Sequence, residues 1–166
     1  MAQVCYKVGD DISTDVIYPG RFMATVLPSE TPQYCFADDE DFNKQLNSGS
    51  ILKGSVVVGG KNFGCGSSRE QAVSTLKGPE LIIVAKSFAR IFLQNAINLG
   101  LRTIICPDIE ANVGDELEIG ERTLENKTTG KTFNVIPLPS SRQAIVDAGG
   151  LIPYTRKRVL EKAGRK

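Results

Sequence analysis

The sequence predicts an α/β fold in which a parallel β-α-β-α-β core is followed by a β-rich C-terminal appendage. Three short runs rich in β-branched residues alternate with two stretches of helical periodicity, which is the pattern of a parallel sheet with covering helices. After Asp108 the pattern changes to short strands separated by turn residues, which is typical of antiparallel pairing. A chain of 166 residues is long enough for one domain with its own apolar core.

The parallel core is expected between residues 55 and 106. A helix is predicted over Ser68–Lys77, closed by Gly78 and Pro79, and a second begins after a cap at Ser87 and ends at Gly100. The three core strands are expected at Ser55–Gly60, Leu81–Ala85 and Arg102–Cys106.

The segments on either side of the core are less regular. A short strand is expected at Val4–Val8. Residues 24–47 are predicted to form a long, mobile loop with one short helix near Phe42–Leu46, because they combine prolines with an acidic run. The last residues, 155–166, form a basic tail. The remaining predicted strands and helices are Glu116–Ile119, Arg122–Asn126, Thr132–Ile136, Ser141–Ala148 and Thr155–Lys162.

Composition excludes several classes of protein. A net charge of +1 gives no field that favours nucleic acid, and no segment has the apolar length of a membrane span or of a signal peptide, so a cytoplasmic protein is expected. The four cysteines form no CxxC pair, so neither a zinc site nor an iron–sulfur ligand run is predicted in this chain. The chain has no histidine, which excludes Ser-His-Asp and Cys-His mechanisms.

The stretch Gly59–Glu70, GGKNFGCGSSRE, carries the densest set of unusual residues. Glycines such as Gly64 and Gly66 allow close approach of a ligand to the backbone, and a following helix offers free N–H groups. Arg69 adds a planar cation suited to a carboxylate. The segment therefore predicts an anion site, although the glycines could instead serve only to turn the chain into a helix capped by Ser67. Walker A and GxGxxG nucleotide motifs are near misses in spacing.

A serine in this loop could act as a base without histidine. Its alkoxide would need backbone N–H groups and a fixed cation around it, and it could then remove a proton from a carbon next to a carboxylate. Removal of a hydroxyl group from the neighbouring carbon also needs a Lewis acid, which nothing in this chain supplies.

Three ordered motifs resemble one known family. GGKNFGCGSSRE, the run AKSFARIFLQNAINLGL at 85–101 and the opening STDVIYPGRF at 13–22 are similar to the small subunit, or swivel domain, of the aconitase superfamily. The similarity runs over residues 7–106 and reappears at GGLIPY, residues 149–154. The most similar group is the stand-alone small subunits of the 3-isopropylmalate dehydratase and homoaconitase type.

The resemblance implies a single swivelling β/β/α domain over residues 1–166. It also implies a partner, a large subunit with a [4Fe-4S] cluster, and a hydro-lyase reaction on a hydroxy dicarboxylic acid such as 3-isopropylmalate, as in leucine biosynthesis. The chain itself would bind no cofactor and could self-associate when alone. Homoaconitase, dimethylmalate dehydratase or a related hydratase is the alternative within the family, and a non-catalytic anion-binding module is the alternative outside it.

The resemblance also assigns roles to residues. Ser67 would be the base, with Ser68 as its hydrogen-bonding neighbour, and Arg69 would bind a substrate carboxylate. Asp15 would orient these groups, and Thr14 would support them from behind.

Two positions depart from the family pattern. Gln71 stands where many relatives have histidine. The run Phe22-Met23-Ala24-Thr25 replaces a segment in which homoaconitase-type relatives carry an arginine for a distal carboxylate, and Ala24 takes the arginine position. An apolar specificity loop of this kind suits an alkyl substituent, while Arg21 nearby could still face a carboxylate.

Overall fold

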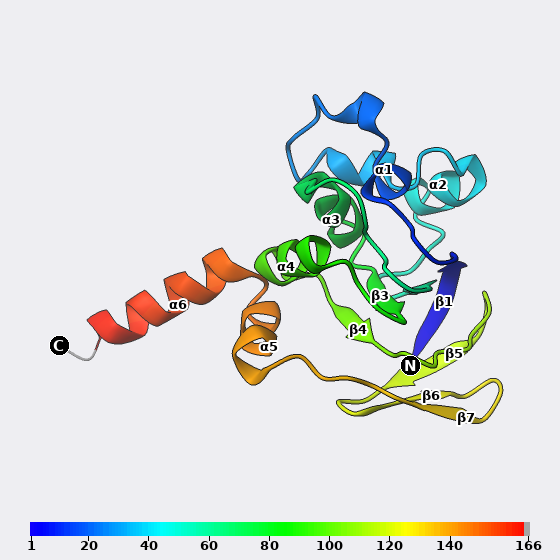
Figure 1. The fold of residues 1–166 in the computed structure, drawn as a ribbon. Coiled ribbons are helices and arrows are strands. Elements are labelled where there is room, and N and C mark those ends of the chain that lie inside the picture. Colours follow the sequence, from blue (N-terminus) through cyan, green and yellow to red (C-terminus); the bar gives the residue numbers. More distant parts are fainter. Residues whose placement is uncertain (165–166) are drawn as a thin grey trace.

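A seven-stranded mixed sheet organises the structure, a computed structural model that describes residues 1–164 (Figure 1). Its strand order is β4-β3-β2-β1-β5-β6-β7, in which β1 to β4 run parallel and β5 to β7 form an antiparallel meander paired to β1. The strands are β1 (Ala2–Lys7), β2 (Val56–Gly59), β3 (Ile82–Ala85), β4 (Thr103–Ile105), β5 (Glu116–Ile119), β6 (Thr123–Asn126) and β7 (Lys131–Asn134).

Helices cover one face of the parallel strands, and two of them form the β-α-β-α-β crossovers that the sequence predicts. α3 connects β2 to β3, and α4 connects β3 to β4. The α-helices are α1 (Thr14–Ile17), α2 (Glu40–Asn47), α3 (Glu70–Lys77), α4 (Arg90–Leu99), α5 (Ser140–Asp147) and α6 (Leu151–Ala163), and 3₁₀-helices lie at Gly20–Phe22 and Thr31–Tyr34.

Two apolar clusters lie on opposite faces of the parallel strands. Val57 and Ile83 pack toward the helices, in a cluster that includes Leu76 of α3 and Phe92 of α4. Val56, Val58, Ile82 and Val84 point the other way and pack against residues of β5 to β7. Strands covered on both faces need continuous apolar runs, which explains the sequence VVV in β2. The layers are therefore β/β/α, as the family resemblance implies.

The predicted β-rich C-terminal appendage is continuous with the parallel core, because its first strand, β5, pairs with β1 in the same sheet. β1 is shared between the two halves, and its register shifts between Val4 and Tyr6. An irregularity of this kind bends a strand and strengthens its twist. A single bridge between Ile105 and Ile136 connects the far end of the parallel half to the segment after β7.

Both crossover helices begin later than the sequence suggests. α3 starts at Glu70, not at Ser68, and its N-cap residue Arg69 makes no capping bond because a guanidinium has no acceptor; the side chain turns back toward α1 instead. α4 starts at Arg90, and Ser87 is not its cap; the Ser87 hydroxyl instead accepts the backbone N–H of Asn62 at 2.9 Å. The Ser87 hydroxyl, which could have capped α4, therefore serves the glycine-rich loop.

Residues 24–47 contain more structure than the long loop expected from the sequence. The predicted helix is present as α2, which is capped by the Asp39 carboxylate accepting the N–H of Phe42 at 3.0 Å. A 3₁₀-helix precedes it, and Cys35 and Phe36 between the two are buried in the core. Residues 23–30 are mostly exposed, and mobility of this part stays a prediction.

The final helix projects from the body of the molecule (Figure 1). α6 begins at Leu151, four residues before the predicted start, and contains Pro153 in its first turn, where the missing N–H would have no helical partner in any case. None of its residues is buried. Arg165 and Lys166 of the predicted basic tail lie outside the described residues. Among residues 1–164, no helix has the length and apolar character needed to cross a membrane.

Candidate active site

Two segments that are about fifty residues apart in the sequence run side by side and form the floor of the site. The N–H of Asp11 donates to the carbonyl of Lys61 at 2.8 Å, and the N–H of Gly64 donates to the carbonyl of Ile12 at 2.7 Å. A short parallel bridge between Ser13 and Cys65 continues this pairing. The opening motif STDVIYPGRF is thereby held against the glycine-rich loop, so the two motifs form one site.

Ser67 is supported from behind by Thr14. The Thr14 hydroxyl lies 3.1 Å from the Ser67 Oγ and also 3.1 Å from the Ser67 carbonyl oxygen. Thr14 is 2% exposed, whereas Ser67 itself lies on the surface. The serine hydroxyl is therefore accessible to a ligand while its orientation is fixed by a buried partner. The neighbour that contacts Ser67 is Thr14 rather than Ser68, whose carbonyl accepts from the Asn95 amide at 3.4 Å.

Arg69 is the cation of the site. Its Nη1 forms an ion pair with Asp15 and also donates to the Tyr18 carbonyl at 3.4 Å. The arginine side chain is 16% exposed and that of Asp15 is 59% exposed, so the arginine is held between protein groups while the carboxylate faces water. The Nε–H of Arg69 is buried and has no partner among the described residues. An unsatisfied donor of this kind is costly, and a bound carboxylate would relieve it.

The glycines of the loop serve different purposes. Gly64 has a φ of +82°, and a side chain there would meet the Phe92 ring of α4 at 2.2 Å, so close packing of the loop on this helix requires the glycine. Gly66 has a φ of +92°, and a Cβ there would lie 3.6 Å from the Thr14 hydroxyl oxygen. Gly66 is therefore the glycine that stands beside the polar groups of the site.

The predicted specificity loop follows α1 at the edge of the site. Its β-turn is closed by the Thr25 N–H, which donates to the Phe22 carbonyl at 2.9 Å. Met23 and Ala24 at its tip are exposed. Arg21 is held by Asp38 at 2.6 Å and lies over the Phe22 ring, so its guanidinium is engaged away from the Ser67–Arg69 pair.

Groups that could bind a metal ion do not assemble in the described part of the chain. Within residues 1–164, no three histidine, cysteine, aspartate or glutamate side chains come together in a suitable group. Burial raises the pKa of the Cys35 thiol to about 12 and of Cys5 and Cys106 to about 11. These thiols are packing residues, and Cys65, which is half-buried in the loop, donates to the Asp11 carbonyl at 3.4 Å. The residues present do not fit an iron–sulfur cluster.

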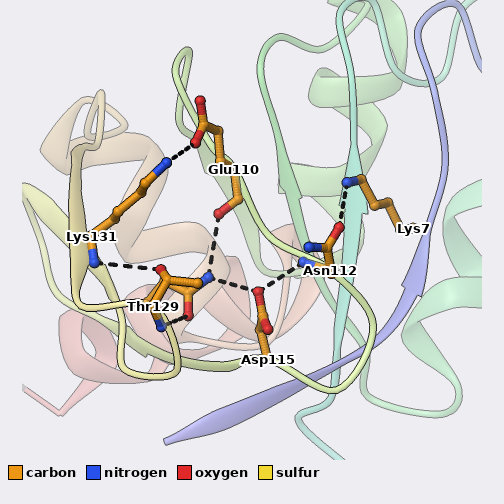
Figure 2. Close-up of polar contacts among 7 residues, drawn as sticks. Lys7, Glu110, Asn112, Asp115, Thr129 and Lys131 are labelled. Atoms are coloured by element: carbon orange, nitrogen blue, oxygen red, sulfur yellow. Dashed lines mark hydrogen bonds and ion pairs between the residues drawn. The ribbon is translucent and has the colours of Figure 1, made fainter.

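A second cluster of polar residues was not indicated by any sequence motif (Figure 2). It lies beside a cavity of about 440 Å³ at the carboxyl ends of β1 to β3, and it does not include Ser67. Lys131 pairs with Glu110 at 2.5 Å, and Lys7 donates to the Asn112 side chain at 2.9 Å. Bonds from the Asn112 backbone N–H and the Asn126 side chain hold the pKa of the nearly buried Asp115 below its usual range. These bonds join β1, the loop before β5 and the β6–β7 turn.

Comparison with known proteins agrees with this geometry. The profile of the family described as the aconitase C-terminal domain matches residues 35–108. The chain is 46% identical over 162 residues to the 3-isopropylmalate dehydratase small subunit of Methanosarcina mazei, covering 95% of this chain and 97% of that protein. This chain belongs to the 3-isopropylmalate dehydratase small-subunit family of the aconitase superfamily.

Two further relatives extend the comparison. The isopropylmalate/citramalate isomerase small subunit of Methanocaldococcus jannaschii is 44% identical over 162 residues, which is 94% of each chain. A crystal structure of the 3-isopropylmalate dehydratase from the same organism matches with a TM-score of 0.89 at 40% identity, covering 99% of this chain and 98% of that one. This chain and that crystal structure therefore share the fold described above over nearly their whole lengths.

Sequence reasoning found most of this site but missed one residue of it. Thr14, Asp15, Ser67 and Arg69 are brought together as expected, whereas Arg21 is turned toward Asp38. Tyr18, whose carbonyl accepts from Arg69, was not singled out. Its position inside the STDVIYPGRF motif was the available signal.

Proposed function

We propose that this chain is the small subunit of a hydro-lyase that isomerises a hydroxy dicarboxylic acid such as 3-isopropylmalate by dehydration and rehydration. The observation that carries the proposal is the exposed Ser67 hydroxyl, held by the buried Thr14 hydroxyl next to the Arg69–Asp15 pair. A base beside a carboxylate-binding cation is the arrangement needed to remove a proton from a carbon adjacent to a carboxylate. Membership of the small-subunit family supports the same reaction.

In this proposal the Ser67 hydroxyl first releases its proton to solvent, and the resulting alkoxide Oγ takes the proton from the substrate carbon. Arg69 holds the adjacent carboxylate through its guanidinium, and Asp15 keeps the guanidinium in place. Thr14 orients the serine, and when Ser67 is in its alkoxide form the Thr14 hydroxyl is placed to donate to that oxygen and stabilise its negative charge before the proton is transferred. Loss of this proton together with the hydroxyl of the neighbouring carbon yields an alkene and water, and addition of water in the opposite sense completes the isomerisation.

The second half of the active site is proposed to belong to a large subunit with a [4Fe-4S] cluster. That cluster would supply the Lewis acid for the leaving hydroxyl, which the residues of this chain do not provide. Small-subunit names among the relatives support such a partner. We expect the complex to be cytoplasmic and to act in branched-chain amino-acid biosynthesis.

The specificity loop favours a substrate with a small alkyl group. Met23 and Ala24 present apolar surface, and no arginine stands at the Ala24 position to receive a third carboxylate. One relative is named an isopropylmalate/citramalate isomerase subunit, which supports citramalate as a second substrate. A homoaconitase substrate with its distal carboxylate has less support, because Arg21 is engaged by Asp38.

Reconstitution tests this proposal directly. The chain is mixed with its large subunit, and alkene formation from 3-isopropylmalate is followed by ultraviolet absorbance. Ser67→Ala should lower kcat by at least about 10³-fold, the loss typical of a removed proton-transfer group, without changing complex formation. Ser50→Ala, at an exposed serine after α2, is the matched control and should retain full activity. Turnover by the isolated chain, or full activity of Ser67→Ala, would contradict the proposal.

A further inference from the structure

Tyr18 connects the arginine of the site to the specificity loop. It follows α1 directly and is 0% exposed. Its backbone carbonyl accepts from Arg69 Nη1 at 3.4 Å. Its hydroxyl, at the other end of the same residue, reaches 3.0 Å from the Phe22 carbonyl and 3.2 Å from the Thr25 carbonyl. One buried residue therefore contacts both Arg69 and the specificity loop.

The Tyr18 hydroxyl holds the turn at its two ends. Phe22 and Thr25 are the first and last residues of the β-turn, and a phenol carries one proton that the two carbonyls share. Met23 and Ala24 lie between these anchored residues and are exposed. Their side chains are largely in solvent, so the position of these residues relative to Arg69 depends mainly on the ends of the turn.

Packing leaves the Tyr18 phenol little freedom. Its ring meets the rings of Phe22 and Tyr34 edge-on, with centroids 6.4 Å and 6.1 Å away, and those two rings are stacked on each other at 4.1 Å. Burial raises the pKa of Tyr18, so the hydroxyl keeps its proton and remains a donor at neutral pH.

We infer that Tyr18 is a positioning residue that sets substrate selectivity by fixing the Phe22–Thr25 turn at a defined place relative to Arg69. This inference rests on the proposed function for its consequence, because the turn would read the alkyl substituent of a substrate whose carboxylate Arg69 holds. Tyr18 does not contact the reacting carbon, so its hydroxyl affects discrimination between substituents more than the proton transfer at Ser67.

Tyr18→Phe keeps the ring and removes the hydroxyl, and Tyr34→Phe is its matched control, because no hydrogen bond of the Tyr34 hydroxyl occurs in the described structure. The first measurement is amide hydrogen exchange of the isolated chain. Exchange at Thr25, whose N–H closes the turn, should accelerate at least about tenfold in Tyr18→Phe and stay unchanged in Tyr34→Phe. An unchanged Thr25 rate in Tyr18→Phe would overturn the anchoring role.

The second measurement uses the complex with the large subunit. The ratio of kcat/KM for 3-isopropylmalate to that for citramalate should fall about tenfold in Tyr18→Phe, mainly through KM, and remain within twofold in Tyr34→Phe. Thr25→Gly, which loosens the turn and keeps Tyr18, should lower the same ratio. An equal loss on both substrates would overturn the selectivity role. If the unmodified complex turned over neither substrate, the proposed function would be wrong. The hydrogen-exchange measurement would still show whether Tyr18 anchors the turn.

Discussion

Replacement of Thr14 by valine is the sharpest test of how Ser67 is activated. The substitution removes one hydroxyl and keeps a β-branched side chain of similar size in a nearly closed site. A hydrogen bond to a charged group contributes about 1.5–3 kcal/mol, and the Thr14–Ser67 bond gains this character when Ser67 loses its proton to become the alkoxide base. Without Thr14 the alkoxide is harder to form by this amount, which corresponds to a fall in kcat of about 10- to 100-fold.

The assay compares two buried threonines that differ in their distance from the site. Thr31 is fully buried and its hydroxyl contacts Ser74 of α3 rather than Ser67, so Thr31→Val removes comparable hydrogen bonding without touching the serine of the site. Both variants should lose about 1–3 kcal/mol of stability, measured by urea unfolding. Only Thr14→Val should lower kcat in the reconstituted complex, with KM nearly unchanged. If Thr14→Val retained kcat within twofold, support of the base by Thr14 would be refuted.

Three further predictions concern the loop and the core. Burial raises the thiol pKa of Cys5, Cys35 and Cys106, so iodoacetamide should label Cys65 first and inhibit the complex. Peptide mass mapping and an activity assay would check this, and earlier labelling of one of the other three cysteines would contradict it. Gly64→Ala should cost at least about 2 kcal/mol in thermal or urea unfolding, since the new methyl group meets the Phe92 ring at a positive φ, and an unchanged midpoint would refute that packing. Bonds from Tyr6 and a backbone N–H lower the pKa of Asp39, so its contribution to stability is complete above about pH 4 and is lost as the pH falls through the lower folded value. Asp39→Asn should flatten the dependence of urea midpoints on pH below about 4, and an unchanged slope would count against this assignment.

The periodicity of the sequence predicted the parallel core well because both faces of those strands are covered. Strands β2 and β3 consist of buried β-branched residues and alanine or glycine, so their apolar runs are unbroken. The starts of α3 and α4 were less predictable. Ser87 has the chemistry of a capping residue, but the backbone N–H of Asn62, from another segment of the chain, uses its hydroxyl instead. Arg69 has no acceptor for capping, and its side chain pairs with Asp15.

The candidate site could be predicted as a set of motifs but not as a set of contacts. The resemblance assigned roles to Ser67 and Arg69, and the structure adds that Thr14, rather than Ser68, is the partner of Ser67. The role of Tyr18 depends on three carbonyl contacts, which are backbone features that residue types do not encode.

The sequence by itself determined the class of the fold, the family and the absence of histidine chemistry, because these depend on local periodicity, motif similarity and composition. Only the tertiary structure decided which side chains meet. Residues 9–14 and 60–67 are joined by backbone hydrogen bonds, whose donors and acceptors almost every residue type carries, so the residue types do not show which two segments pair. The glycine-rich loop becomes a site only where this pairing places Thr14 next to its serine and Asp15 next to its arginine.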